Sequence, residues 1–385
     1  MTRVLIAPDK FKGSLTAAQV GAAVAAGIRQ VLPHASTVVV PVADGGDGTV
    51  AAALAAGFEA MPGRAAGPTG ESVDTMYARR DDLAVVELAD VSGLLRLPGG
   101  QPAPMTATSR GTGEVIAAAI EAGCRRVVLG VGGSAGTDGG AGLLRALGAR
   151  LLDADGNEIA DGGAALAEMQ TLDLTALRER MAGVRLTVAS DVDNPLTGPR
   201  GAAQIYGPQK GADSAQTATL DAALTHWADI VAATTGHDHR NTAGAGAAGG
   251  VGFAAVAILD AALSPGIELI LALSDFDNQL KDANLVITGE GTLDAQTLHG
   301  KAPAGVAAAA RAAGIPVVAV CGRNTLSDNR LQAAGFTATY PLTDLDPNIH
   351  HCITNAAPLL THLATHIAQH HLSAANPHAH QPHRL

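Results

Sequence analysis

Aromatic residues are scarce in this 385-residue chain, which has one Trp, three Tyr and five Phe. A core with so few rings must be packed mainly from Ala, Val, Leu and Ile. That composition suits helices lying close on a β-sheet. Rings on which a base or a sugar could stack are correspondingly few.

Basic clusters, long apolar runs and paired cysteines are also absent. The chain has 25 Lys and Arg against 36 Asp and Glu, a net charge of −11, with no basic run. Nucleic acid and anionic membranes are therefore poor partners. No apolar stretch reaches the ~18 residues of a membrane span. The apolar run in the start MTRVLIAPDK is too short for a secretion signal, so we expect a cytoplasmic protein. Cys124, Cys321 and Cys352 lie far apart without a CxxC, which indicates buried thiols rather than a disulfide framework or a zinc site.

The length predicts about two domains. Short β-branched runs recur along the chain, each followed by a Gly, Asp or Ser cluster and an alanine-rich helical stretch. This alternation predicts a mostly parallel α/β sheet covered on both faces, with ligands bound outside the carboxyl ends of its strands. The predicted strands are 4–7, 37–42, 83–88, 126–131, 186–189, 269–273, 284–288 and 316–320.

The two ends of the chain differ in character. Near the start, Thr16 and Gln19 form a capping-box pattern for a helix that runs to about Leu32 and is stopped by Pro33. Residues 350–385 contain nine of the 14 histidines. We interpret this His-rich end as a frayed surface terminus, with adventitious metal binding as the alternative.

Two familiar nucleotide-binding motifs are missing. There is no GxxxxGK[ST], which excludes a P-loop NTPase, and no GxGxxG follows the first predicted strand, which disfavours a dinucleotide-binding Rossmann domain. Pro8-Asp9-Lys10 stands there instead. The segment DKFKGS (9–14) places a carboxylate and two ammonium groups in the loop that leads into a predicted helix. The N-terminus of a helix favours anions. We expect this loop to hold a carboxylate or phosphate, the alternative being a solvated loop.

Three loops are unusually rich in glycine. ADGGDGT (43–49) and GVGGSAGTDGGAG (130–142) each follow a predicted strand, and GAGAAGGVG (244–252) lies further on. Glycine lets backbone amides approach an oxyanion closely, so these loops are candidates for phosphate binding. An ordinary Asp-Gly turn in the first and a close-packed helix entry in the last are the alternatives.

Two further loops combine acids with polar groups. In SDVDNPLTG (190–198), Asp191 and Asp193 point to the same side if the strand geometry persists. They could hold Mg²⁺ or accept a proton from a hydroxyl, while an Asx turn before Pro195 would explain only Asn194. The segment TGEGTLDAQT (288–297), followed by Lys301, likewise has a predicted strand followed by glycines, acids and a lysine. Amides for phosphate, lysines for charge and acids for Mg²⁺ are what phosphoryl transfer requires.

The chain resembles the bacterial glycerate kinases of the type that phosphorylates the 2-hydroxyl. The matching segments span residues 5 to about 305, and the family commonly has Glu at position 47, Asn at 137 and often Ser at 10. The segments are APDKFKGSLTA, PVADGGDGTV, TSRGTGEVI, GVGGSAGTDGGAGLLRALG, SDVDNPLTGPRGAAQIYGPQKGA, GAGAAGGVG and VITGEGTLDAQTLHGKAP, in that order.

The resemblance implies a discontinuous Rossmann-like domain built from both chain ends, residues 1–75 and 285–375. A second α/β domain, residues 76–284, is inserted, and 376–385 form a His-rich tail. It also implies an active site in the cleft between the domains. There the clusters near Asp9, Asp44, Glu290 and Asp294 would face those near Ser134, Asp191 and Gly246.

The resemblance further implies phosphorylation of D-glycerate by Mg·ATP to 2-phosphoglycerate and ADP. We expect Asp191 to accept the hydroxyl proton, Lys12 to stabilise negative charge, and Asp193 to bind Mg²⁺. The few rings predict loose nucleotide selectivity, and a homo-oligomer is left open. The expected glycerate-binding residues are Asp9, Lys10, Ser14, Asp44, Gly45 and Gly46; the expected Mg·ATP-binding residues are Gly132, Gly133, Ser134, Gly246, Gly289, Glu290, Gly291 and Asp294.

Three alternatives stay open. A glycerate 3-kinase would give 3-phosphoglycerate, and the two hydroxyls of a three-carbon acid lie too close together for the residues to distinguish them. An NAD-dependent hydroxy-acid oxidoreductase shares the fold class but needs a GxGxxG. A non-catalytic carboxylate-binding protein would release no ADP.

Overall fold

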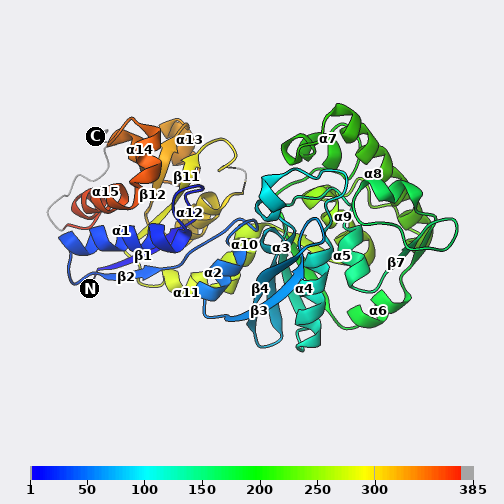
Figure 1. Ribbon diagram of the computed structural model, residues 1–385. Helices are drawn as coiled ribbons and strands as arrows, with labels where there is room; N and C mark the ends of the chain where they lie inside the picture. The colour runs from blue at the N-terminus through cyan, green and yellow to red at the C-terminus, as the bar shows by residue number, and fades with distance from the viewer. Residues whose placement is uncertain (1, 299, 374–385) are drawn as a thin grey trace. The chain divides into compact units, whose positions relative to one another are not determined.

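The computed structural model describes residues 2–298 and 300–373 (Figure 1). These residues form two compact units: the first contains the chain up to Asp44, Ala51–Ala56 and the part that starts at Ile267, and the second contains Gly45–Val50 and Gly57–Gly266. The expected boundaries at residues 75/76 and 284/285 lie further along the chain than these. Residues 59–80 pair with the second unit's sheet, and residues 267–280 pack in the first unit. The predicted tail, 376–385, lies outside the described residues. The interpretation of the His-rich end as a frayed terminus is wrong for its first part, because the helices Ile349–Thr354 and Ala356–His371 lie there and the second of them has a buried side.

The first unit is a five-stranded parallel sheet in the order β13-β12-β11-β1-β2. Its strands are β1 (Arg3–Pro8), β2 (Ser36–Val39), β11 (Leu285–Leu293), β12 (Val317–Asn324) and β13 (Ala338–Pro341). Its helices are α1 (Ala17–Val31), α10 (Gly266–Leu273, from its second residue), α11 (Phe276–Leu280), α12 (Ala302–Ala312), α13 (Asp328–Ala333), η6 (Leu342–Asp344), α14 (Ile349–Thr354) and α15 (Ala356–His371). Helix α2 (Thr49–Ala55) starts in the second unit and continues in the first.

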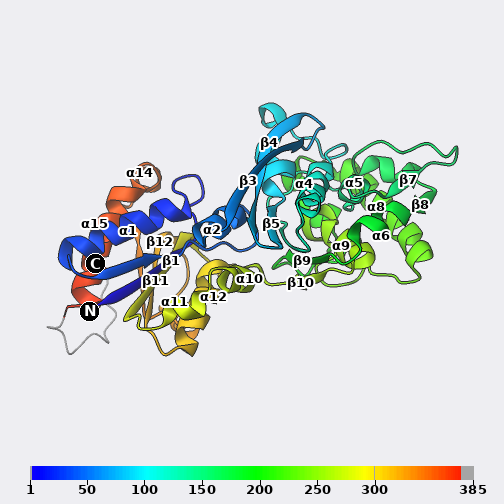
Figure 2. The ribbon, with the colours of Figure 1, turned by 90° about the horizontal axis from the view of Figure 1, so that it is seen from below.

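Alternating strand residues direct helices to both faces of this sheet. Val4 and Ile6 belong to a cluster with buried residues of α1 and α15, whereas α12 contacts β1, β11 and β12 without joining that cluster. Figure 2 shows α1 and α15 on the side of the sheet opposite α12. The predicted capping box at the start of α1 is confirmed, because Gln19 N donates to Thr16 Oγ1 and Thr16 N donates to Gln19 Oε1.

The second unit has a mixed six-stranded sheet in the order β10-β9-β6-β5-β4-β3, in which β5, β6, β9 and β10 are parallel. A two-stranded β7–β8 sheet accompanies it. Its strands are β3 (Glu59–Ala66), β4 (Ser72–Arg80), β5 (Leu83–Glu87), β6 (Arg126–Gly130), β7 (Arg150–Leu152), β8 (Thr171–Asp173), β9 (Arg185–Ala189) and β10 (Ala262–Ser264). Its helices are α3 (Ala89–Ser92), η1 (Leu94–Arg96), η2 (Pro98–Gly100), α4 (Arg110–Glu121), α5 (Ala141–Ala146), η3 (Ala164–Glu168), α6 (Thr175–Met181), α7 (Ala202–Tyr206), η4 (Pro208–Lys210), α8 (Ser214–Thr235), η5 (Ala247–Gly249) and α9 (Val251–Leu259).

The predicted α/β class with mainly parallel strands is confirmed, but one predicted strand is wrong. Residues 269–273 belong to helix α10, in which Ile267, Ile270 and Leu273 are buried at helical spacing. A short apolar run fits either a buried strand or a helix, and spacing alone did not separate the two. The edge strand β3 was not predicted, since it contains a proline and is mostly exposed.

The expectation of buried thiols is confirmed. All three cysteines are free and buried. In the described part of the chain, no helix combines the length and the apolar character needed to cross a membrane.

Candidate active site

In the first unit, the parallel pairing of β1 with β11 brings two acidic loops together. The register pairs Pro8 with Gly289, so the next residues, Asp9 and Glu290, follow at the carboxyl edge of the sheet. Asp9 N donates to Gly289 O at 2.8 Å. Asp9 is only 6% exposed and Glu290 only 8%. These two carboxyl groups are therefore held largely out of water.

Burial changes the protonation of both acids. It raises the pKa of Asp9 to about 6, where Lys10 opposes the shift and Asp44 adds to it. It raises the pKa of Glu290 to about 7, where Thr297 and Lys301 oppose the shift and Asp9 and Asp294 add to it. The edge thus concentrates negative charge in a poorly hydrated place, a pattern typical of functional sites.

Cations and hydroxyls partly compensate these acids. Lys10 Nζ lies 3.6 Å from Asp9 Oδ1, and Lys301 Nζ lies 3.9 Å from Glu290 Oε2. Thr297 Oγ1 donates to Glu290 Oε1, while Asp294 N donates to Thr297 Oγ1 at 3.0 Å. Of the predicted residues, Asp9, Lys10, Asp44, Glu290 and Asp294 therefore gather at one edge.

The loop that carries Lys12 is a tight turn beside this edge. Phe11 is buried, and Phe11 N donates to Leu15 O at 2.8 Å. Lys12 is exposed, and its amide nitrogen lies 3.4 Å from the place that a Cβ on Gly291 would occupy. Ser14 Oγ donates to Ile353 O at 2.6 Å, so this hydroxyl ties the loop to α14.

In the second unit, two glycine loops meet backbone to backbone. Gly132 N donates to Gly45 O at 3.2 Å. A Cβ on Gly132 would lie 2.5 Å from Gly46 Cα, and one on Gly133 would lie 2.7 Å from Asp47 Oδ1. Close packing of the two loops therefore requires glycine here, whatever the loops bind.

A buried ammonium group fixes the start of the longer glycine loop. Lys210, at the end of η4, is 2% exposed. Its Nζ donates to Ser134 Oγ at 2.8 Å and also to Gly136 O. Burial lowers the pKa of Lys210 to about 7, against the opposing charge of Asp138. The predicted residue Ser134 is thus oriented by a lysine.

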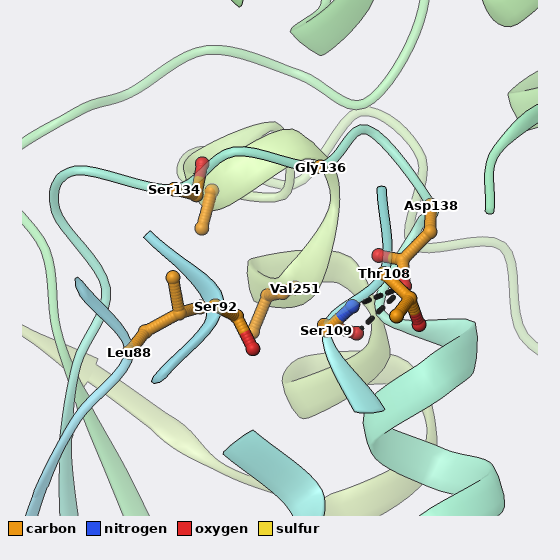
Figure 3. Close-up of a pocket in the computed structure, with 9 residues that line it drawn as sticks. Leu88, Ser92, Thr108, Ser109, Ser134, Gly136, Asp138 and Val251 are labelled. Atoms are coloured by element: carbon orange, nitrogen blue, oxygen red, sulfur yellow. Dashed lines mark hydrogen bonds between the residues drawn. The ribbon is translucent and has the colours of Figure 1, made fainter. Parts of the chain in front are cut away.

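A buried carboxylate fixes the end of the same loop. Asp138 is 1% exposed. It accepts hydrogen bonds from Ser109 N at 2.7 Å, Ser109 Oγ at 2.8 Å, Gly140 N at 3.1 Å and Gly142 N at 3.2 Å. Figure 3 shows Asp138 and Ser109 facing each other beside a small pocket that Ser134 also lines.

The remaining predicted loops contact one another within this unit. Asp191 Oδ1 accepts from Gly266 N at 2.9 Å, at the start of α10. Asp193 is exposed and forms an ion pair with Arg200 at 3.3 Å. Gly246 N donates to Asn194 O at 2.8 Å. The glycines that follow pack on the longer glycine loop, residues 130–142, since Gly139 N donates to Gly249 O at 2.9 Å.

Comparison with known proteins identifies the chain. The model of the glycerate kinase family matches residues 4–372. The chain belongs to the glycerate kinase family. A Bacillus subtilis protein named glycerate kinase is 42% identical over 373 residues, which are 95% of this chain and 97% of that protein.

Two further members of the glycerate kinase family are similar over most of their length. An Escherichia coli protein named glycerate 2-kinase is 44% identical over 342 residues, which are 88% of this chain and 90% of that protein. A crystal structure from Salmonella typhimurium LT2, described as a glycerate kinase 2, superposes with a TM-score of 0.82 at 40% identity. It covers 96% of this chain and 97% of its own.

Three polar residues that hold the glycine loops of this glycerate kinase family member were not predicted from the sequence. Lys210 and Asp138 are described above. The third is Glu87 at the end of β5, which accepts from Gly48 N at 3.1 Å and Val50 N at 3.0 Å. Lys210 and Asp138 lie inside segments already matched to the family. A charged residue within an apolar or glycine-rich stretch is the sequence signal that could have identified both as buried.

The raised pKa of Glu290 predicts a pH-dependent stability. In the folded protein the Glu290 carboxyl keeps its proton up to about pH 7, whereas in the unfolded chain it loses the proton at about pH 4.5. Ionised Glu290 therefore lowers the free energy of unfolding progressively as the pH rises between these values. Relative to wild type, Glu290→Gln should gain on the order of 1–3 kcal/mol in unfolding free energy from pH 4.5 to 7.5. Urea unfolding at both pH values measures this, with the exposed Glu268→Gln as the control. A difference between variant and wild type that stays constant with pH would contradict the prediction.

Proposed function

We propose that the protein transfers the γ-phosphoryl group of Mg·ATP to the 2-hydroxyl of D-glycerate, giving 2-phosphoglycerate and ADP. The observation that carries the proposal is the match of the glycerate kinase family model to residues 4–372. The name of the E. coli relative, glycerate 2-kinase, favours the 2-position. The alternative product is 3-phosphoglycerate. An oxidoreductase and a non-catalytic binding protein are disfavoured by membership in a kinase family.

The chemistry of the two units suits phosphoryl transfer, which depends mainly on positioning and on neutralising charge. The first unit provides exposed Lys12, with Lys10 and Lys301 nearby in its acidic edge. In our proposal, Lys12 stabilises the carboxylate of glycerate or the transferred phosphoryl group. The second unit provides the glycine loop around Gly132 and Ser134 for the nucleotide phosphates.

Asp191 is our candidate for the group that accepts the proton of the substrate hydroxyl. It follows β9 at the carboxyl end of a parallel strand, where α/β proteins place their ligands. Its Oδ1 accepts a hydrogen bond from Gly266 N, which fixes the orientation of the carboxylate. A fixed carboxylate is suited to general base catalysis.

The chain's acids also fit a nucleotide-bound Mg²⁺. Mg²⁺ is commonly held by one or two carboxylates together with substrate phosphates and water. In residues 2–298 and 300–373 no group of three or more His, Cys, Asp or Glu is arranged to hold a metal alone, which agrees with an ion that arrives with ATP. Asp193 remains our predicted ligand. Asp9 and Glu290 are further candidates, because burial and neighbouring carboxylates raise the pKa of both and a cation would relieve that unfavourable charge. Bound Mg²⁺ would neutralise phosphate charge.

We further propose that the enzyme acts in the cytoplasm. It uses ATP in this proposal, and its three cysteines are free thiols, as is usual in a reducing compartment.

Product analysis tests the proposed reaction. Incubation with Mg·ATP and D-glycerate should release ADP and give a product whose NMR spectrum shows phosphorus coupled to the proton on carbon 2. Coupling to the carbon-3 protons instead would establish the 3-kinase alternative. No ADP release across a panel of small hydroxy acids would contradict the kinase proposal as a whole.

Substitution of the proposed base gives a second test. Asp191→Asn keeps an oxygen for Gly266 N but cannot take a proton, so kcat should fall by 10²-fold or more. Asp155→Asn, in an exposed turn, is the matched control and should retain full activity. If kcat of Asp191→Asn stays within about threefold of wild type, less than ~0.7 kcal/mol of barrier, another residue is the base.

The two loop lysines make a matched pair. Lys12 is exposed, whereas Lys10 is engaged with Asp9, so Lys12→Ala should lower kcat/KM for glycerate far more than Lys10→Ala. Steady-state kinetics at saturating ATP measures both. Equal losses would overturn the special role given to Lys12.

A further inference from the structure

We propose that His362 and His366, on the exposed side of α15, form a chelating site for one divalent transition-metal ion such as Zn²⁺, Ni²⁺ or Cu²⁺. The site is independent of the proposed kinase reaction. It lies in α15, a helix of the first unit that contributes no residue to the candidate active site described above.

The spacing and geometry of the two imidazoles fit chelation. Residues four apart lie one above the other on a helix, and two histidines at this spacing can bind one metal ion. His362 Nε2 and His366 Nε2 lie 3.2 Å apart. Two nitrogens bonded to one metal at ~2.0–2.1 Å lie about 2.9–3.4 Å apart for coordination angles from square to tetrahedral. The two rings therefore already have the separation that a shared ion requires.

Helix α15 holds this pair on a fixed backbone. On its inner side, Leu363 and Ile367 are fully buried. Thr361 Oγ1 donates to Ala23 O in α1 at 3.2 Å. A Cβ on Gly27 would lie 2.1 Å from Thr361 O, so α1 and α15 approach closely there. Binding a metal would then order only two side chains, which lowers its entropic cost.

The outer side leaves the pair accessible and chemically suited to these metals. His362 is exposed and His366 is half-buried. Burial, followed by the charges of His362 and His370, lowers the pKa of His366, which favours the neutral imidazole that binds metal. Imidazole suits Zn²⁺, Ni²⁺ and Cu²⁺, whereas Mg²⁺ prefers oxygen. The site is thus distinct from a nucleotide-bound Mg²⁺.

A bound ion would link two successive turns of α15. Because the unfolded chain does not hold the two rings at this distance, the ion binds the folded protein in preference. It should raise stability according to its concentration relative to Kd. Water would complete the coordination, since the described residues offer no group of three or more metal-binding side chains.

Metal titration of the full-length chain tests the proposal. The parent for this experiment carries His378→Ala, His380→Ala and His383→Ala, because these histidines of the sequence could bind metal by themselves. Calorimetric titration with Zn²⁺ or Ni²⁺ should show one equivalent bound. His362→Ala and His366→Ala should each weaken that binding at least tenfold. Saturating metal should raise the melting temperature of the parent but not of the double variant.

The matched control also removes two imidazoles from the same unit, both of them exposed. His34→Ala/His350→Ala should leave the metal affinity and the metal-dependent rise in melting temperature unchanged. The proposal is overturned if the parent binds no equivalent of metal. It is also overturned if the His362 and His366 variants bind as tightly as the parent, or if the control pair loses as much affinity as they do.

Discussion

The parallel pairing of β1 with β11 is the contact on which the acidic edge of the first unit depends. It joins residues 281 apart in the sequence, as in the hydrogen bond from Thr288 Oγ1 to Ala7 O. Without it, Asp9 and Glu290 would each be hydrated loop acids. With it, burial raises the pKa of both carboxyl groups toward neutrality, and the charge of Asp9 adds to the shift of Glu290. The sheet therefore creates the electrostatic property that neither loop has alone.

The second unit uses glycine in a different way from the one its sequence suggests. Gly132 and Gly46 meet because no side chain fits between the two loops, and the loop near Gly249 packs on the same backbone. Two charged residues then hold the glycine-rich backbone in place. Lys210 donates a hydrogen bond to Ser134 near the start of the loop, and Asp138 accepts hydrogen bonds from amides and a hydroxyl near its end. Packing and phosphate binding are compatible uses of such loops, because amides that face away from the contact stay available.

Local patterns predicted much of this architecture. Most of the predicted strands and the capped first helix are present, since alternating apolar runs and cap residues act over a few residues. The strand expected at 269–273 is helix α10, because a five-residue apolar run has no distinctive period. Lys210, Asp9 and Glu290 are buried by contacts with residues far away in the sequence, and this burial shifts their pKa values. No short window of sequence contains such contacts. The roles of Asp191, Asp193 and Lys12 remain predictions.

The Asp138 cluster has a consequence for how the glycine-rich segment moves. The amide hydrogens of Ser109, Gly140 and Gly142 all point at one carboxylate that is sealed from water. Exchange of these hydrogens with solvent deuterium requires the cluster to open, so we expect them to exchange about as slowly as hydrogens of a core strand. A stretch with the composition of a flexible linker would then be one of the well-protected parts of its unit.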